Sequence, residues 1–131
     1  MLLNRLLDGT NAPLLEQVVR FAAARHKLIV ENIANVDTPG YRHKDLSIEH
    51  FQDLLRERVE ERRRGGRVRF DDIALDPHHP QAGILFHDRN NRSMEKLASD
   101  LAGNGLLHNV AIELLRKQYL SMEMALKERV T

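Results

Sequence analysis

The stretch 32–41, Asn-Ile-Ala-Asn-Val-Asp-Thr-Pro-Gly-Tyr, constrains this chain most, because a helix cannot continue through it. Pro39 lacks a backbone N–H and disfavours the helical conformation at Thr38. Pro39 and Gly40 fit the two central positions of a type II turn, where glycine supplies the positive φ. Asp37 is expected to accept hydrogen bonds from nearby backbone N–H groups. The stretch therefore predicts a helix end followed by a tight turn.

One amphipathic helix is predicted over 12–35, directly before this turn. Thr10-Asn11 offers a cap, and Pro13 falls in the first turn, where its missing N–H costs little. Asn32 and Asn35 are three residues apart and are expected to face the same way. Residues at heptad spacing form a seam along the helix: Leu15, Val19, Ala22, His26, Ile29 and Ile33.

A longer helix is predicted over 93–131, and Ser93 is placed to cap it. Its seam keeps a four-three alternation for more than four heptads, which is typical of a coiled-coil-like helix. The seam contains Met94, Ala98, Leu101, Gly105, His108, Ile112, Leu115, Tyr119, Met122 and Leu126. A second stripe beside it contains Leu107, Ala111, Leu114 and Gln118. Gly103 and Gly105 predict a weak point or bend.

The matching seams predict that helix 12–35 runs antiparallel to helix 106–128. Ile33 would then lie near His108, and residues 94–105 would extend beyond the first helix. One stripe of the long helix would pack within the molecule and leave the other for a neighbour.

The fold class expected is all-α, with N- and C-terminal amphipathic helices in an antiparallel coiled-coil hairpin. A largely extended or irregular middle segment joins them. Within it, Ser47 is placed to cap a second helix that ends at Gly65-Gly66. The apolar face of that helix would contain Ile48, Phe51, Leu55 and Val59. Residues 66–92 show no core-forming pattern and are expected to be mostly extended or irregular.

Composition excludes several classes of function. The 131 residues contain no cysteine, which removes disulfides, thiolate metal sites and cysteine nucleophiles. Residues 1–8 are too short and interrupted for a secretory signal, and no run approaches the about 18 apolar residues of a membrane span. We therefore expect a protein that is cytosolic or leaves the cytosol without a cleaved signal.

No catalytic, cofactor-binding or metal site is expected. His78, His79 and His87 would be the candidate metal ligands, but adjacent histidines point apart on a strand and no cysteine supports them. We interpret them as loop residues. His26 and His108 interrupt the apolar seams and are interpreted as a polar layer that sets helix register.

An arginine cluster at 56–69 contains seven arginines and three glutamates. It lacks the aromatic platform or recognition helix of a nucleic-acid site, so a solvated helix end is the simpler interpretation. A cytosolic helical adaptor or RNA-contacting protein that uses Arg56–Arg69 remains the alternative function. Salt-dependent nucleic-acid binding would favour that alternative.

Two amphipathic helices with a polar middle bury little surface, so such a chain is marginally stable as a monomer. Apolar stripes left exposed on a long helix usually mark contacts with other chains. The residues alone therefore favour an assembly protein over a solitary enzyme.

The complete turn stretch resembles the signature of the bacterial flagellar basal-body rod proteins, where it also follows an N-terminal amphipathic helix. The residues that match are Asn32, Ile33, Ala34, Asn35, Asp37, Thr38, Pro39, Gly40 and Tyr41. In the C-terminal half, Asp88-Arg89-Asn90-Asn91 resembles the Asp-Gly-Asn-Asn element of this family, with Arg89 in place of glycine. Residues 106–109 and 113–119 resemble the helix that follows.

The resemblance covers 12–45 and 85–128, and the short chain is most like the proximal member of the family. It implies a structural subunit that polymerises into the proximal drive-shaft tube and is required for motility. It also implies export by the flagellar type III apparatus without a cleaved signal peptide, and a location in the periplasmic rod of the basal body.

The partners implied are copies of the chain itself, other rod subunits, and membrane-ring and export-apparatus components. Nucleic acid, direct membrane insertion, catalysis and cofactors are not implied. The division expected is a flexible N-terminus (1–11), an N-terminal rod helix (12–35), a turn signature (36–45), a variable middle (46–92) and a C-terminal rod helix (93–131). The residues expected to pair the helices and support assembly are Leu15, Val19, Ala22, Ile29, Ile33, Leu107, Ala111, Ile112, Leu115, Tyr119, Met122 and Leu126.

Overall fold

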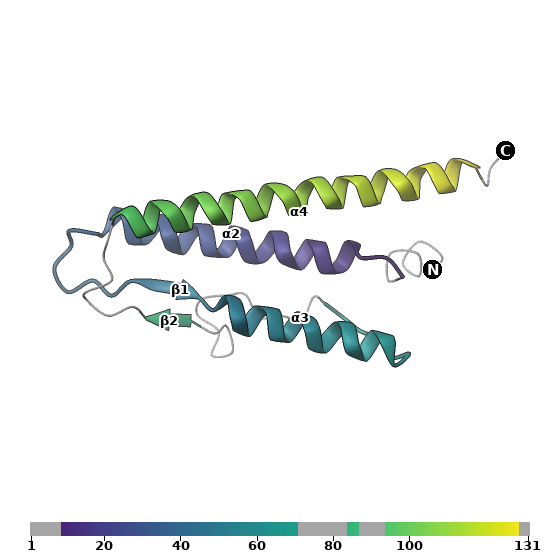
Figure 1. Ribbon diagram of the computed structural model, residues 1–131, viewed down its shortest axis with the longest axis horizontal. Coiled ribbons are helices and arrows are strands. Elements are labelled where there is room, and N and C mark those ends of the chain that lie inside the picture. Colours follow the sequence, from purple (N-terminus) through teal and green to yellow (C-terminus); the bar gives the residue numbers. More distant parts are fainter. Residues whose placement is uncertain (1–8, 71–83, 87–93, 129–131) are drawn as a thin grey trace.

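A computed structural model of the chain describes residues 9–70, 84–86 and 94–128, and most of them are helical, as expected of an all-α protein. In Figure 1, helix α2 lies between the longer helix α4 and the shorter helix α3. The elements in chain order are α2 (Ala12–Ala34), β1 (Lys44–Leu46), α3 (Ile48–Arg63), β2 (Ile84–Phe86) and α4 (Met94–Glu128).

Helix α2 ends and turns where the sequence predicted. Gly40 has a φ of 75°, and the Tyr41 N–H donates to the Thr38 carbonyl at 3.3 Å across the turn. Asp37 was expected to accept from backbone N–H groups, but the side chain that makes local hydrogen bonds here is Asn35, whose amide donates to the Glu31 carbonyl at 2.8 Å. Its carbonyl oxygen accepts from the Thr38 hydroxyl at 3.2 Å. An amide side chain, which can donate as well as accept, thus closes the end of α2.

The middle of the chain contains the second helix that was predicted after Ser47. The Ser47 hydroxyl accepts from the His50 N–H at 3.1 Å and caps α3, as predicted. The ring of Phe51 stacks on that of Phe21 in α2, with centroids 4.1 Å apart, and joins Leu28 and Leu46 in the buried core.

Strand β1 forms at the boundary between the expected turn signature (36–45) and the expected variable middle (46–92), where no strand was predicted. It pairs antiparallel with β2, so that Asp45 lies opposite Leu85. A strand of three residues, Lys-Asp-Leu, is too short to show a period of its own, and its pairing comes from a partner about 40 residues away.

Helices α2 and α4 pack side by side and run in opposite directions (Figure 1). The Asn104 side-chain amide donates to the Ala22 carbonyl at 2.7 Å, and the Tyr119 hydroxyl donates to the Glu16 carboxylate. The expected register was therefore wrong: Ile33 does not lie near His108. Residues 94–105 pack along α2, and the end of α4 beyond Tyr119 extends past the start of α2 (Figure 1).

The face of α4 that packs on α2 also differs from the predicted seam, because about every second seam residue is replaced there by a neighbouring residue. Its most buried residues are Leu97, Asn104 and Ala111, whereas Met94 and Ala98 are exposed. His26 is exposed and cannot form the polar layer expected of it. Asn104 is a buried polar residue of α4 that contacts α2. A heptad pattern permits several registers. The hydrogen bond to Ala22 satisfies the buried Nδ2 of Asn104, while its Oδ1 has no hydrogen-bond partner among the described residues.

Helix α4 continues without interruption through Gly103 and Gly105, where a weak point or bend was predicted, and a Cβ added at Gly103 would meet no atom within 4 Å.

We expect Gly103→Ala to raise the free energy of unfolding by about 0.5–1 kcal/mol, because alanine loses less backbone entropy in a helix. Gly40→Ala should lower it by about 1–2 kcal/mol, because the turn requires a positive φ. Urea denaturation measures the free energy of unfolding of both variants. A Gly103→Ala variant less stable than the native protein would contradict the unbroken helix with free space at Gly103.

Candidate assembly surface

A buried ion pair joins α2 to β1. The Arg25 guanidinium donates from Nε to Asp45 Oδ1 at 2.8 Å and from its terminal nitrogen to Oδ2 at 2.9 Å. Both side chains are about nine-tenths buried. Asp100 in α4 lies 4.0 Å from the same guanidinium, so three elements meet there. The hydrogen bond to Asp45 raises the pKa of Arg25 above its ordinary value, although burial acts in the opposite direction.

The amide of Asn32 makes a second tie between the same two elements. Its nitrogen donates to the Lys44 carbonyl at 2.7 Å, and its oxygen accepts from the Lys44 N–H at 3.0 Å. A side-chain amide has the donor and acceptor of a peptide group, so Asn32 pairs with β1 as a strand residue would. Asn32 is buried and Asn35 is not, so the two asparagines act differently.

The remaining signature residues surround the turn. Asp37, Thr38, Pro39 and Gly40 are exposed, and Tyr41 is half-buried with its ring 5.8 Å from that of His43. Burial raises the pKa of the Tyr41 hydroxyl. The exposed corner leaves its side chains available to another molecule, while Asn32 anchors it from within.

The residues expected to pair the helices fall into three groups. The buried ones are Ala22, Ile29 and Ala111. The half-buried ones are Leu15, Val19, Ile33, Ile112, Leu115 and Met122. Leu107, Tyr119 and Leu126 are exposed. The structure thus places the list on both the inner face and the outer surface of the helix pair.

Sequence reasoning missed Arg25, Asp45 and Asn104. Arg25 follows Ala22 by three residues and precedes Ile29 by four, which places it on the buried face of α2. That position was a usable signal for Arg25. Its partner Asp45 carried no comparable signal, because the contact depends on the path of the turn.

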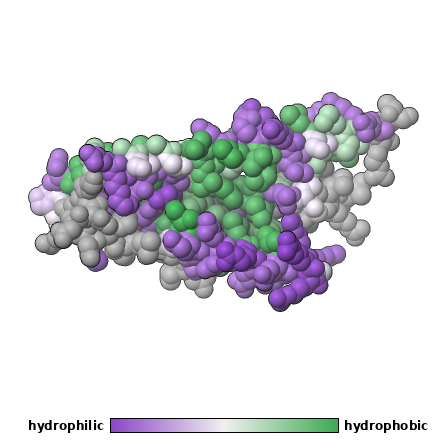
Figure 2. Space-filling model, in the orientation of Figure 1, coloured by the Kyte–Doolittle hydropathy of each residue, from purple (hydrophilic) through white to green (hydrophobic). Residues whose placement is uncertain are grey.

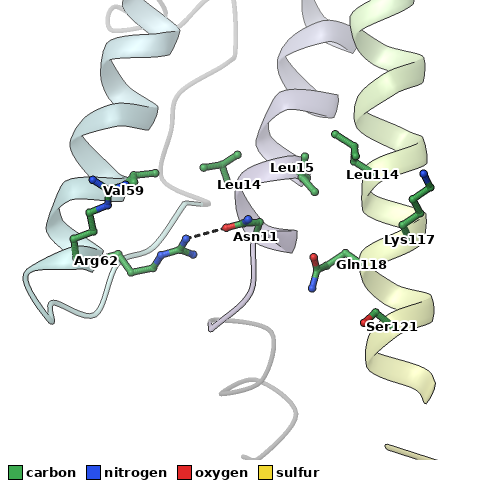
Figure 3. Close-up of a pocket in the computed structure, with 10 residues that line it drawn as sticks. Asn11, Leu14, Leu15, Val59, Arg62, Leu114, Lys117, Gln118 and Ser121 are labelled. Carbon is green, nitrogen blue, oxygen red and sulfur yellow. Dashed lines mark hydrogen bonds between the residues drawn. The ribbon is translucent and has the colours of Figure 1, made fainter. Parts of the chain in front are cut away.

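An exposed apolar patch runs along α4 and contains Leu106, Leu107, Val110 and Leu114. Figure 2 shows apolar surface across the middle of this face, bordered by the hydrophilic surface of α3. Beside the patch is a groove of about 580 Å³ between the three helices (Figure 3). Its lining consists of Asn11, Leu14, Leu15, Val59, Arg62, Arg63, Leu114, Lys117, Gln118 and Ser121.

Much of the arginine cluster is engaged within the chain. Arg56 lies 2.9 Å from Asp53, Arg58 lies 3.4 Å from Glu61 and Arg64 lies 3.8 Å from Glu60. Arg62 donates to the Thr10 carbonyl at 2.9 Å and ties the end of α3 to the start of α2. These contacts weaken the case for a phosphate-binding surface.

The described residues contain no group of three side chains suited to hold a metal ion. His78, His79 and His87 lie outside the described residues. Among the helices that the structure describes, none is both long and apolar enough to span a bilayer.

The buried ion pair leads to a stability prediction. We expect Asp45→Leu to lower the free energy of unfolding by about 3–5 kcal/mol, because the buried Arg25 loses both of its close hydrogen bonds and keeps only Asp100 at 4.0 Å. The double variant Arg25→Met/Asp45→Leu should recover much of this loss. Asp53→Leu removes the partner of an exposed pair and should cost under about 1 kcal/mol. Chemical denaturation tests the set, and a double variant no more stable than Asp45→Leu would contradict the assignment.

Comparison with known proteins points to the flagellum. No family model matches the chain. It is 28% identical over 115 residues to the flagellar basal body rod protein FlgB of Bacillus subtilis (strain 168), covering 86% of this chain and 89% of that protein. It is 25% identical over 124 residues to the protein of the same name from Aquifex aeolicus (strain VF5), covering 95% and 97%. These matches extend over most of the chain and confirm the resemblance found in the turn: the protein is FlgB-like, similar to flagellar basal-body rod proteins.

Proposed function

We propose that this chain is a structural subunit of the bacterial flagellar basal-body rod, polymerises into the proximal tube of the drive shaft and is required for motility. The observation that carries the proposal is the similarity to two rod proteins over 86% and 95% of the chain. The mostly helical fold agrees with such a role.

We further propose that α2 and α4 act together as an antiparallel coiled-coil hairpin in the assembled rod. Three polar contacts between the helices support this: Asn104 to Ala22, Tyr119 to Glu16 and Arg25 to Asp100. The residues Leu15, Val19, Ala22, Ile29, Ile33, Ala111, Ile112, Leu115 and Met122 would hold the pair together. Leu107, Tyr119 and Leu126, which are exposed, would contact neighbouring subunits.

The turn signature would direct the chain out of the hairpin. Gly40 provides the positive φ, and Asn32 ties the departing chain to the end of α2. In a polymer an error in this direction would recur at every subunit. Location in the periplasmic rod, export by the flagellar apparatus, and contacts with other rod subunits and membrane-ring components belong to the same proposal, for which the sequence resemblance is the support.

The assembly role predicts a specific motility defect. Leu107 is 41% exposed, so Leu107→Glu should leave the fold and free energy of unfolding nearly unchanged. A charge placed on a surface that becomes buried in the assembly lacks a partner, so we expect loss of swimming and of rod incorporation. Each variant would be expressed in a strain lacking the native gene and tested by swimming assay and by detection in purified basal bodies.

Gln52→Glu is the control, because it adds the same charge to an exposed position on α3. This variant should swim normally. Normal motility of Leu107→Glu would contradict the use of this α4 surface in assembly. Absence of the native protein from purified basal bodies would contradict the function itself.

A further inference from the structure

We infer that copies of this chain join through two different sides of α4: the three-helix groove on one copy and the side that carries Tyr119 on the next. The inference rests on the proposed function in one respect, that the neighbour is a second copy in an open assembly. It goes further by assigning which surfaces meet.

The groove side combines apolar surface with positive charge. Leu14, Val59 and Leu114 provide apolar lining, and Leu114 is 47% exposed. The charged residues that line the groove are Arg62, Arg63 and Lys117, and none is acidic. Among the described residues no carboxylate forms an ion pair with Arg63 or Lys117. Figure 3 shows the groove open between α3, α2 and α4.

The opposite side of α4 combines apolar surface with carboxylates. A shallow hollow of about 350 Å³ is lined by Ile112, Leu115, Arg116, Tyr119, Leu120 and Glu123. Leu120 is 50% exposed. The Glu16 carboxylate accepts a hydrogen bond from the Tyr119 hydroxyl and adds a second negative charge to this side, where Glu123 is the first.

The cations on this side already have partners. Arg116 lies 3.1 Å from Glu113, and Lys127 lies 2.6 Å from Glu123. The charged residues of the lining are Arg116 and Glu123, and Glu16 joins them through Tyr119, so this side carries two carboxylates and one cation and is net negative. The groove, with three cations in its lining, is net positive.

The groove and the Tyr119 side are two separate surfaces of α4. Leu114 and Glu123 are nine residues apart, which is about 2.5 helical turns, so they point to opposite sides of α4. Both sides are apolar, and their charges are opposite in sign. Like charges would meet if either surface faced itself, so electrostatics favours a groove facing the Tyr119 side. Such a contact leaves one free surface of each kind and continues into a filament or tube instead of closing as a dimer.

Cross-linking of the purified full-length chain tests this arrangement, because the sequence contains no cysteine. Leu114→Cys places a thiol on the groove side, and Leu120→Cys places one on the Tyr119 side. Both side chains are about half exposed, so both variants should fold. With a short bismaleimide, we expect the mixture of the two variants to give a cross-linked dimer in much higher yield than either variant alone.

Asp53→Cys, on the exposed surface of α3, is the control and should give little product with either variant. Cross-linking only within single variants would show a contact between like surfaces and overturn the inference. No mixed product at high protein concentration, or equal yield with Asp53→Cys, would also overturn it.

Charge reversal provides a second test. Lys117→Glu in the Leu114→Cys variant should lower the mixed yield by about twofold to fivefold, as expected for an exposed charge pair. Glu123→Lys in the Leu120→Cys partner should restore it. Failure to restore would contradict the charge pairing. If the mixture gives cross-links but the protein is absent from basal bodies, the rod function is wrong and this contact stands. If the protein is present in basal bodies but the mixture gives no cross-links, the function stands and this contact is wrong.

Discussion

The buried pair of Arg25 and Asp45 is the interaction on which the rest of the structure depends. A guanidinium and a carboxylate removed from water are tolerated only when paired with good geometry, and here two hydrogen bonds of 2.8 and 2.9 Å join them. The pair fixes β1 against the middle of α2, and Asp100 brings α4 to the same point. The two hydrogen bonds between Asn32 and Lys44 join the segment after the turn to the end of α2. They therefore fix the direction in which the chain leaves the turn at Gly40.

This anchoring places α3 on one side of α2 and leaves α4 covered mainly along its inner face. Phe51 then stacks on Phe21 and fills the small core. The apolar residues on the outer surface of α4 have no such partner among the described residues, as Figure 2 shows for the face that it displays. A chain with a small core and an exposed apolar helix gains stability when neighbours bind it, which is the behaviour required of an assembly subunit.

Local features of the fold were predictable from the sequence. Pro39 and Gly40 determine the turn by backbone sterics alone, and Ser47 marks the start of α3 through its cap. The helix pattern before the turn predicted an end within one residue of that of α2. The register of α2 and α4 was not predictable, because a seven-residue repeat fits several offsets equally well. Asn104 selects one of them through a hydrogen bond to a backbone carbonyl 82 residues away, which no local pattern indicates. Part of the candidate site was also predictable: the turn at Pro39 and Gly40 could be found from the sequence. The Arg25–Asp45 pair and the groove could not, because they form only when the helices pack together.

Cryo-electron microscopy of basal bodies purified from the source bacterium tests the central claim most directly. We expect this chain to be present in the rod wall, with α2 and α4 of the same copy antiparallel, Asn104 beside Ala22, and β1 held at Arg25. Absence of the chain from the rod, or a subunit in which α4 pairs with a different copy's α2 and β1 lies away from Arg25, would contradict it.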